Sequence, residues 1–93
     1  MTESTVLIAD DHPIFRQGLR KIIEESGEWR VVGEAETGES ALRLIEFHDA
    51  DVALIDIAMP VMDGIEVLRR LAADNHPCLP VIVTSYDESA YLE

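Results

Sequence analysis

The chain has 93 residues, enough for one small domain, and its hydrophobic fraction of 47% is typical of a globular protein. Its 19 acidic residues against 7 Lys and Arg give a formal net charge of −12, which argues against direct binding to nucleic acid backbones or anionic membranes. The single cysteine, Cys78, excludes an internal disulfide framework and a cysteine-based zinc site, and it favours a reducing cytoplasm. No apolar run approaches the ~20 residues of a membrane span, and the N-terminus lacks a signal-peptide pattern.

The first half of the chain alternates short apolar runs with helical patterns. Residues 6–10 predict a buried strand, and a helix is expected from Pro13 to the Ser26-Gly27 pair, where Gly27 can adopt a left-handed cap. Residues 29–35 predict a second strand, and residues 37–40 open a second helix. The first helix carries apolar positions at helical spacing: Ile14, Phe15, Gly18, Leu19, Ile22 and Ile23. In the second helix, the positions expected to face inward are Ala41, Leu42 and Ile45.

The second half repeats this alternation. Residues 52–57 predict a third strand, residues 58–64 a turn-rich loop, and residues 81–84 a fourth strand preceded by Pro77 and Pro80. A third helix is expected to carry Ile65, Leu68, Leu71 and Ala72, and residues 87–90 resemble the start of a fourth helix. Strict alternation of strands and helices predicts an α/β fold with a doubly wound parallel sheet and right-handed crossovers.

Acidic residues end two of the predicted strands. Asp10 and Asp11 follow the apolar run 6–9, and Asp56 follows the apolar run 52–55. The carboxyl ends of parallel strands lie along one edge of a sheet, where ligand sites form, so we expect these acids to converge. Converging carboxylates repel one another unless a cation or protons lie between them. The pattern therefore predicts a divalent metal site beside an acid that has separate chemistry to perform.

These residues resemble the receiver domain of two-component response regulators. The resemblance is carried by the pair Asp10-Asp11, by Asp56, by the loop of residues 59–64 and by Thr84 at the end of the fourth strand. Residues 10–19 and 31–35 are similar to the NarL/LuxR-type subfamily, whose members usually carry a C-terminal helix-turn-helix DNA-binding domain, expected in the full-length protein and absent here. The resemblance implies a flavodoxin-like fold with strand order 2-1-3-4. It also implies that residues 1–93 form a phosphoacceptor domain that is incomplete at its C-terminus and lacks the fifth strand and last helices.

The same resemblance implies a role for each site residue. Asp56 would accept a phosphoryl group from a sensor histidine kinase, with Mg²⁺ as the cofactor. Asp11 would bind Mg²⁺ directly, Asp10 would bind it through a water, and Asp56 and the backbone carbonyl of Ala58 would be further ligands. Thr84 would hydrogen-bond a phosphoryl oxygen as the switch residue. Non-functional interpretations stay open. In these, the acids only cap helices or accept hydrogen bonds from backbone donors, and the Thr84 hydroxyl lies in solvent.

Other residues near the site have simpler interpretations. Gly64 would supply a backbone conformation that other residues resist, or a close backbone approach. Asp63 is expected to cap the third helix rather than bind metal. His12 is interpreted as a solvated surface histidine, and Trp29 as a packing residue. Tyr86 either leans over the site or packs elsewhere.

The chain departs from the family pattern after strand four. Receiver domains carry a lysine that contacts the phosphoryl group and an aromatic switch residue on strand five, both beyond residue 93, and Lys21, the only lysine, lies mid-helix. Strand four would then be a sheet edge with uncovered apolar side chains, a template for pairing with another chain. Three explanations for the missing elements remain. The sequence is the ordered part of a longer protein, a fragment cut from one, or a natural truncation stabilised by swapping or homodimerisation.

We therefore expect a cytoplasmic response regulator that controls transcription through its output domain, contacts DNA only through that domain, does not contact membranes, and is not itself an enzyme. Two rivals remain. One is a pseudo-receiver or interaction module without phosphotransfer, suggested by the absence of the strand-five lysine. The other is a Mg²⁺-dependent phosphohydrolase with Asp56 as nucleophile, which Ala58 disfavours, because such enzymes often carry a second aspartate at that position.

Overall fold

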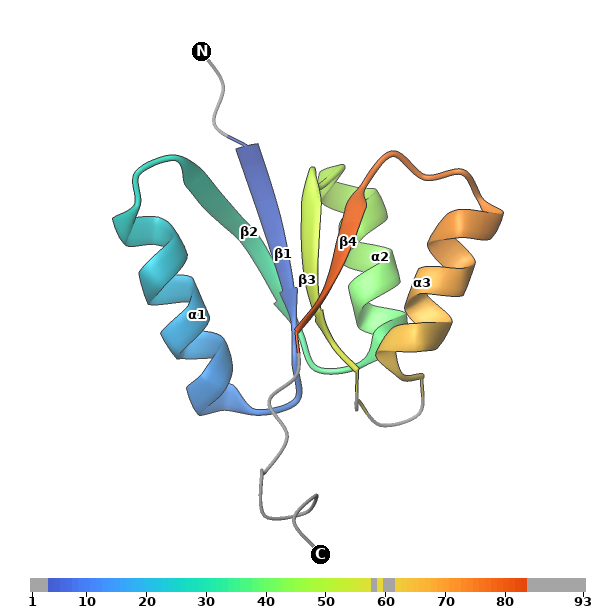
Figure 1. The fold of residues 1–93 in the computed structure, drawn as a ribbon, viewed down its shortest axis with the longest axis horizontal. Helices are drawn as coiled ribbons and strands as arrows, with labels where there is room; N and C mark the ends of the chain where they lie inside the picture. The colour runs from blue at the N-terminus through green and yellow to red at the C-terminus, as the bar shows by residue number, and fades with distance from the viewer. Residues whose placement is uncertain (1–3, 58, 60–61, 84–93) are drawn as a thin grey trace, which may run out of the picture.

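The computed structural model describes residues 4–57, 59 and 62–83. Strands and helices alternate along this part of the chain (Figure 1). In chain order the elements are β1 (Ser4–Ala9), α1 (Pro13–Glu25), β2 (Trp29–Ala35), α2 (Gly38–His48), β3 (Val52–Asp56), α3 (Gly64–Ala73) and β4 (Leu79–Val83). The predicted α/β alternation is confirmed.

The strands form one parallel sheet in the order β2-β1-β3-β4, so the predicted strand order is also confirmed. Helix α1 lies on one face of the sheet, and α2 and α3 lie together on the other (Figure 1). The chain reverses its winding direction between β1 and β3. In open sheets of this kind, ligands bind outside the carboxyl ends of the strands at that reversal.

Two apolar clusters hold the layers together. On β1, Leu7 and Ala9 belong to the larger cluster, on the side of α2 and α3, whereas Val6 and Ile8 belong to the cluster on the side of α1. This separation follows from the period of two along a strand, which turns successive side chains to opposite faces. Because both faces of β1 are covered, its last four residues are fully buried, which explains the continuous apolar run in the sequence.

Short polar signals define the helix ends. Thr37 accepts a hydrogen bond from the Ser40 backbone N–H at 3.1 Å, and Asp63 accepts one from the Glu66 N–H at 3.0 Å, so each caps the helix that follows. The predicted capping role of Asp63 is confirmed. Gly27 has φ of +75°, the left-handed conformation expected after α1. The Thr37 and Asp63 side chains satisfy backbone donors that the helices themselves cannot pair.

Several details of the helices and of β4 differ from the sequence-based expectation. No residue of α1 is fully buried: Leu19 and Ile23 pack against the sheet, but Ile14 and Ile22 are exposed. In α3 the expected Leu71 is buried, but Val67 is buried as well, whereas Ile65 is exposed. The predicted start of β4 is wrong as well, because the strand begins at Leu79 and includes Pro80. Proline is tolerated in a strand that pairs on one side only, where no ladder hydrogen bond is lost.

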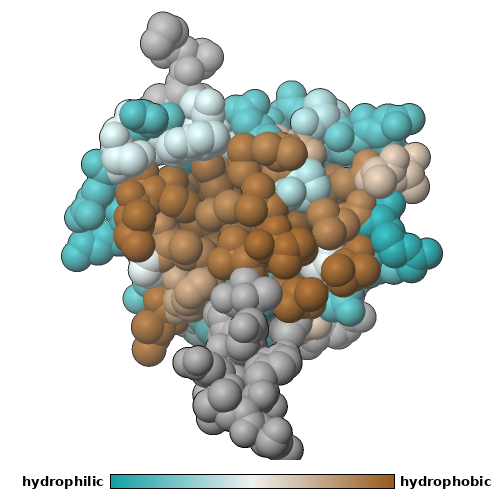
Figure 2. Space-filling view, viewed as in Figure 1, coloured by the Kyte–Doolittle hydropathy of each residue, from teal (hydrophilic) through white to brown (hydrophobic). Residues whose placement is uncertain are grey.

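The sheet face beside α1 presents a broad apolar surface (Figure 2). It includes a small hollow lined by Val6, Ile23, Trp29, Val52 and Leu54, which supports the prediction that Trp29 is a packing residue. Leu79 and Val81 of β4 are exposed, as expected for an edge strand. Among the described residues, no helix has the length and apolar character needed to cross a bilayer.

Candidate functional site

Two buried carboxylates meet at the carboxyl ends of adjacent strands. Asp10 directly follows β1 and is 1% exposed, and Asp56 ends β3 and is 2% exposed. β1 and β3 are hydrogen-bonded neighbours, with Ala9 opposite Ile55 in the register. Two aspartates in this position are costly for stability, because both lose water and both carry negative charge. The burial therefore indicates a function rather than a contribution to folding.

Asp11 and His12 complete the cluster. One carboxylate oxygen from each of the three aspartates and one ring nitrogen of His12 lie within 4.8 Å of one another. The convergence predicted for Asp10, Asp11 and Asp56 is therefore present in the structure. Asp11 Oδ1 is a buried atom that accepts no hydrogen bond from the described residues. A buried, unsatisfied oxygen facing other oxygens is the environment expected around a hard divalent cation.

His12 is more involved in the cluster than its sequence interpretation predicted. Its side chain is 58% exposed, as a surface residue should be, yet Nδ1 lies 2.9 Å from Asp10 Oδ1 and 3.0 Å from Asp11 Oδ1. The hydrogen bond to Asp10 and the negative charge of Asp11, and then the charges of Asp10 and Asp56, hold the pKa of His12 above its usual 6.5, although desolvation acts the other way. The signal in the sequence was simply the adjacency of His12 to the acidic pair.

A basic network supports the backbone beneath the cluster. Arg16 on α1 donates through Nη1 to the backbone carbonyl of Asp10 at 2.7 Å, and through Nε to Glu34 at 3.0 Å. Arg20 also donates to Glu34, at 2.7 Å. The hydrogen bonds and charges of the two arginines lower the pKa of Glu34, and Glu34 in turn raises the pKa of Arg20. Arg16 therefore positions the end of β1 through the Asp10 carbonyl and pairs its charge with Glu34.

Gly64 allows the loop after β3 to close against the strand end. A Cβ atom at this position would lie 2.6 Å from the Asp56 carbonyl oxygen and 3.0 Å from Ile57 Cα. The Gly64 N–H also donates to the Ile57 carbonyl at 3.1 Å. Of the two explanations expected for Gly64, close backbone approach is the one that the structure supports. This glycine therefore fixes how α3 begins beside Asp56.

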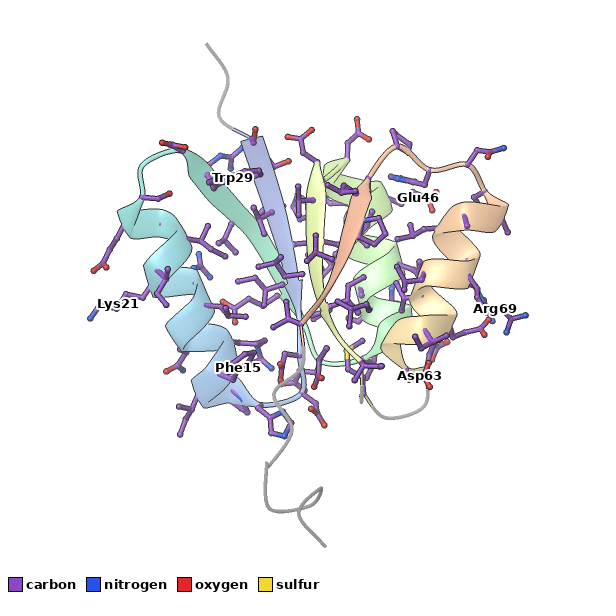
Figure 3. All side chains as sticks on the ribbon, in the orientation of Figure 1. Phe15, Lys21, Trp29, Glu46, Asp63 and Arg69 are labelled. Atoms are coloured by element: carbon purple, nitrogen blue, oxygen red, sulfur yellow. The ribbon has the colours of Figure 1, made fainter. Side chains whose placement is uncertain are left out.

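Some predicted residues cannot be placed. Ala58, the expected carbonyl ligand, and Thr84, the expected switch residue, lie outside the described residues, as does Tyr86. Lys21 projects from the outer side of α1, away from the sheet, whereas Asp63 lies near the start of α3 (Figure 3). The expectation that Lys21 is wrongly placed for the site is therefore confirmed.

The residues present fit Mg²⁺, the ion that the resemblance implies. Mg²⁺ prefers oxygen ligands, and three carboxylates converge with one buried oxygen left unsatisfied by the described residues. Asp10 accepts the His12 backbone N–H through Oδ1 at 2.7 Å, which orients that carboxylate toward the cluster. Asp10, Asp11 and Asp56 could therefore hold a divalent cation.

Comparisons with known proteins agree with this geometry. The family model described as "Response regulator receiver domain" matches residues 6–93. A protein of Mycobacterium tuberculosis named "Probable transcriptional regulatory protein NarL" is 42% identical over 85 residues, which are 91% of this chain and 39% of that protein. The signal receiver domain of NarL from that organism superposes with a TM-score of 0.89 at 40% identity, covering 97% of this chain and 73% of that one.

A further relative differs in the activity that its name states. A protein-glutamate methylesterase/protein-glutamine glutaminase of Hahella chejuensis is 51% identical over 81 residues, which are 87% of this chain and 23% of that protein. The chain thus spans less than half the length of each of these curated relatives. The similarity covers the part that carries the acidic cluster, and it is shared by proteins with different overall activities.

Proposed function

The chain belongs to the response regulator receiver domain family, and from that premise we propose that it accepts a phosphoryl group on Asp56 in two-component signalling. The observation that carries the proposal is the burial of Asp56 at the end of β3, beside Asp10 and Asp11. An acid that only capped a strand would not need two further carboxylates within reach. A carboxylate nucleophile in a cation-binding cluster is suited to phosphoryl transfer, where positioning and charge neutralisation supply most of the catalysis.

In the proposed reaction a carboxylate oxygen of Asp56 attacks the phosphorus of a phosphohistidine on a sensor histidine kinase. The new P–O bond forms as the P–N bond breaks, and the leaving imidazole takes up a proton. The product is an acyl phosphate on Asp56 and a neutral histidine on the kinase. Because the phosphoryl oxygens would join an already negative cluster, the step requires a cation.

Asp10 and Asp11 would hold that cation. When bound, Mg²⁺ would neutralise charge on the transferring phosphoryl group and orient its oxygens. Asp11 supplies a buried oxygen that accepts no hydrogen bond from the described residues but lies 3.0 Å from His12 Nδ1. Asp10 is held by the His12 N–H and, through its carbonyl, by Arg16. We assign direct ligation to Asp11 and Asp56, and a water-mediated contact to Asp10. The Ala58 carbonyl as a further ligand, and Thr84 as the switch residue, complete the proposal.

The wider role follows from the relatives. Because NarL is named as a transcriptional regulatory protein, we propose that phosphorylation of this domain controls transcription through a DNA-binding output domain. The methylesterase relative shows that the same kind of domain also occurs in proteins with enzymatic names, so relatives of this chain differ in their output domains. The domain itself would undergo phosphorylation without turning over a free substrate. We place this reaction in the cytoplasm, where its kinase partner would act.

Beryllofluoride, a phosphoryl mimic, tests the proposal through ¹⁹F NMR on the protein at its full natural length. A bound fluoride signal is expected only when Mg²⁺ is present, and it should be lost in Asp56→Asn. Asp63→Asn is the matched control, because asparagine preserves the cap of α3 and the residue lies outside the cluster. Absence of a Mg²⁺-dependent signal in the native protein would refute phosphoacceptor function. Turnover of a free phosphate ester would favour a phosphohydrolase instead.

A further inference from the structure

The acidic cluster contains one ring nitrogen, an atom that an all-oxygen magnesium site does not need. His12 Nδ1 lies 2.9 Å from Asp10 Oδ1, 3.0 Å from Asp11 Oδ1 and 3.8 Å from Asp56 Oδ2. It therefore faces one oxygen of each carboxylate. The imidazole belongs to the residue directly after the acidic pair.

These distances match the edges of a metal coordination shell. In an octahedral site with bonds of about 2.1 Å, neighbouring ligand atoms lie about 3 Å apart. The 3.0 Å distance from His12 Nδ1 to Asp11 Oδ1 has this length, and the 3.8 Å distance to Asp56 Oδ2 lies between the values for neighbouring and opposite ligands. The 2.9 Å distance to Asp10 Oδ1 is a hydrogen bond to the carboxylate that we assign to a water-mediated contact. Nδ1 thus occupies the place of a ligand around a shared centre.

We propose that His12 Nδ1 is a ligand of the divalent ion, so that this site binds first-row transition metals more tightly than an all-carboxylate site would. The inference rests on the proposed function, because it concerns the same ion site. Imidazole nitrogen suits Ni²⁺, Co²⁺ and Zn²⁺, whereas Mg²⁺ prefers oxygen. His12 would therefore change which metal the site selects rather than whether it binds one.

The backbone around His12 supports this role. The His12 N–H donates to Asp10 Oδ1 at 2.7 Å, and Pro13 opens α1 immediately afterwards, so the backbone that carries the ring is restrained on both sides. For ligation the ring would be neutral, with its proton on the other nitrogen. The competing explanation is that His12 only forms hydrogen bonds and ion pairs with the acids and leaves when a metal binds.

Pulsed EPR on bound Mn²⁺ separates the two explanations, because it detects nitrogen nuclei coordinated directly to the ion. At mildly alkaline pH, where imidazole is neutral, the native protein should show imidazole ¹⁴N modulation, and His12→Gln should lose it while still binding Mn²⁺. His48→Gln is the matched control and should retain the modulation, since His48 is an exposed residue at the end of α2. Bound Mn²⁺ without nitrogen modulation in the native protein would overturn the inference, and so would a failure of Mn²⁺ to bind.

Calorimetric titration with Ni²⁺ and Mg²⁺ gives a second readout. His12→Gln should weaken Ni²⁺ binding by about tenfold or more, because a nitrogen ligand is replaced, and should leave Mg²⁺ binding nearly unchanged. Equal changes for both ions would overturn the inference. Neither result decides the proposed function, because beryllofluoride binding with Mg²⁺ measures that separately.

Discussion

Aspartates at the two ends of the sheet have opposite surroundings. At the amino end, Asp51 Oδ2 accepts hydrogen bonds from the Thr5 N–H at 2.8 Å and from the Thr5 hydroxyl at 3.1 Å. The Asp51 carbonyl also accepts the Leu79 N–H at 2.9 Å. At the carboxyl end, Asp10, Asp11 and Asp56 face one another and a histidine. The same residue type thus joins three strands at one end and concentrates negative charge at the other.

This difference teaches how to distinguish a structural acid from a functional one. Asp51 is surrounded by donors that the fold brings to it, so it should contribute to stability. The carboxyl-end cluster instead places like charges together, an arrangement that is unfavourable until a cation arrives. Local strain of this kind persists at functional sites because the surrounding structure maintains it.

Among these variants the largest effect on stability is expected at Gly64, which lies against the strand end that carries Asp56. Gly64→Ala would press a methyl group against the Asp56 carbonyl and Ile57 Cα, and should lower the free energy of unfolding by roughly 2–3 kcal/mol in denaturant titration. Gly18→Ala is the matched control, because nothing lies within 4 Å of its Cβ position. In a helix interior that change should be neutral or stabilising. Equal destabilisation by both variants would contradict the close approach at Gly64.

A smaller loss is expected at the amino end. Asp51→Ala would leave the Thr5 N–H and hydroxyl without their acceptor, and should cost about 1–2 kcal/mol of unfolding free energy. Asp51→Asn retains a carbonyl acceptor and should recover most of this loss. Thermal unfolding monitored by circular dichroism measures both changes. An Asp51→Ala variant as stable as the native chain would show that the amino end is not structural in this sense.

The opposite sign is expected for Asp10. Asp10→Asn removes one of the clustered charges but keeps an acceptor for the His12 N–H, so the metal-free variant should be more stable than the native chain by about 1 kcal/mol or less. Mg²⁺ should then stabilise the native chain and leave the variant nearly unchanged, because binding stabilises only the state that binds. Melting curves with Mg²⁺ and with a chelator test this. A destabilised variant without metal would contradict the comparison of the two ends.

The smallest expected effect is on the pH dependence of stability, through the ion pairs that Glu34 forms with Arg16 and Arg20. Because the arginines lower the pKa of Glu34 below its usual 4.5, Glu34 contributes stability that is fully present above that value and is lost as pH falls through the lowered pKa. Glu34→Gln should remove this part of the acid dependence, seen as a flatter stability curve between neutral and acidic pH. An unchanged curve would show that the Arg16–Glu34–Arg20 network contributes nothing measurable.

The sheet and the site could be predicted from the sequence because their signals are strong and local. Continuous apolar runs before Asp10 and Asp56 require strands covered on both faces, and the reversal of strand order brings those strands together. The contacts of His12 and Arg16 could not be predicted, since they depend on how α1 leaves β1. Nor could the exposure of Ile14 and Ile65, because helical spacing shows which residues share a face but not what covers it.

The most direct test of the account is to locate the phosphoryl group chemically. The full-length protein would be phosphorylated with a small phosphodonor in Mg²⁺, the acyl phosphate reduced with borohydride, and the modified residue identified by mass spectrometry. The account predicts modification of Asp56 alone, with loss of the signal when Mg²⁺ is chelated or when Asp56 is replaced by asparagine. Modification of Asp10 or Asp11, or labelling that persists without a divalent cation, would contradict the division of roles among the three carboxylates.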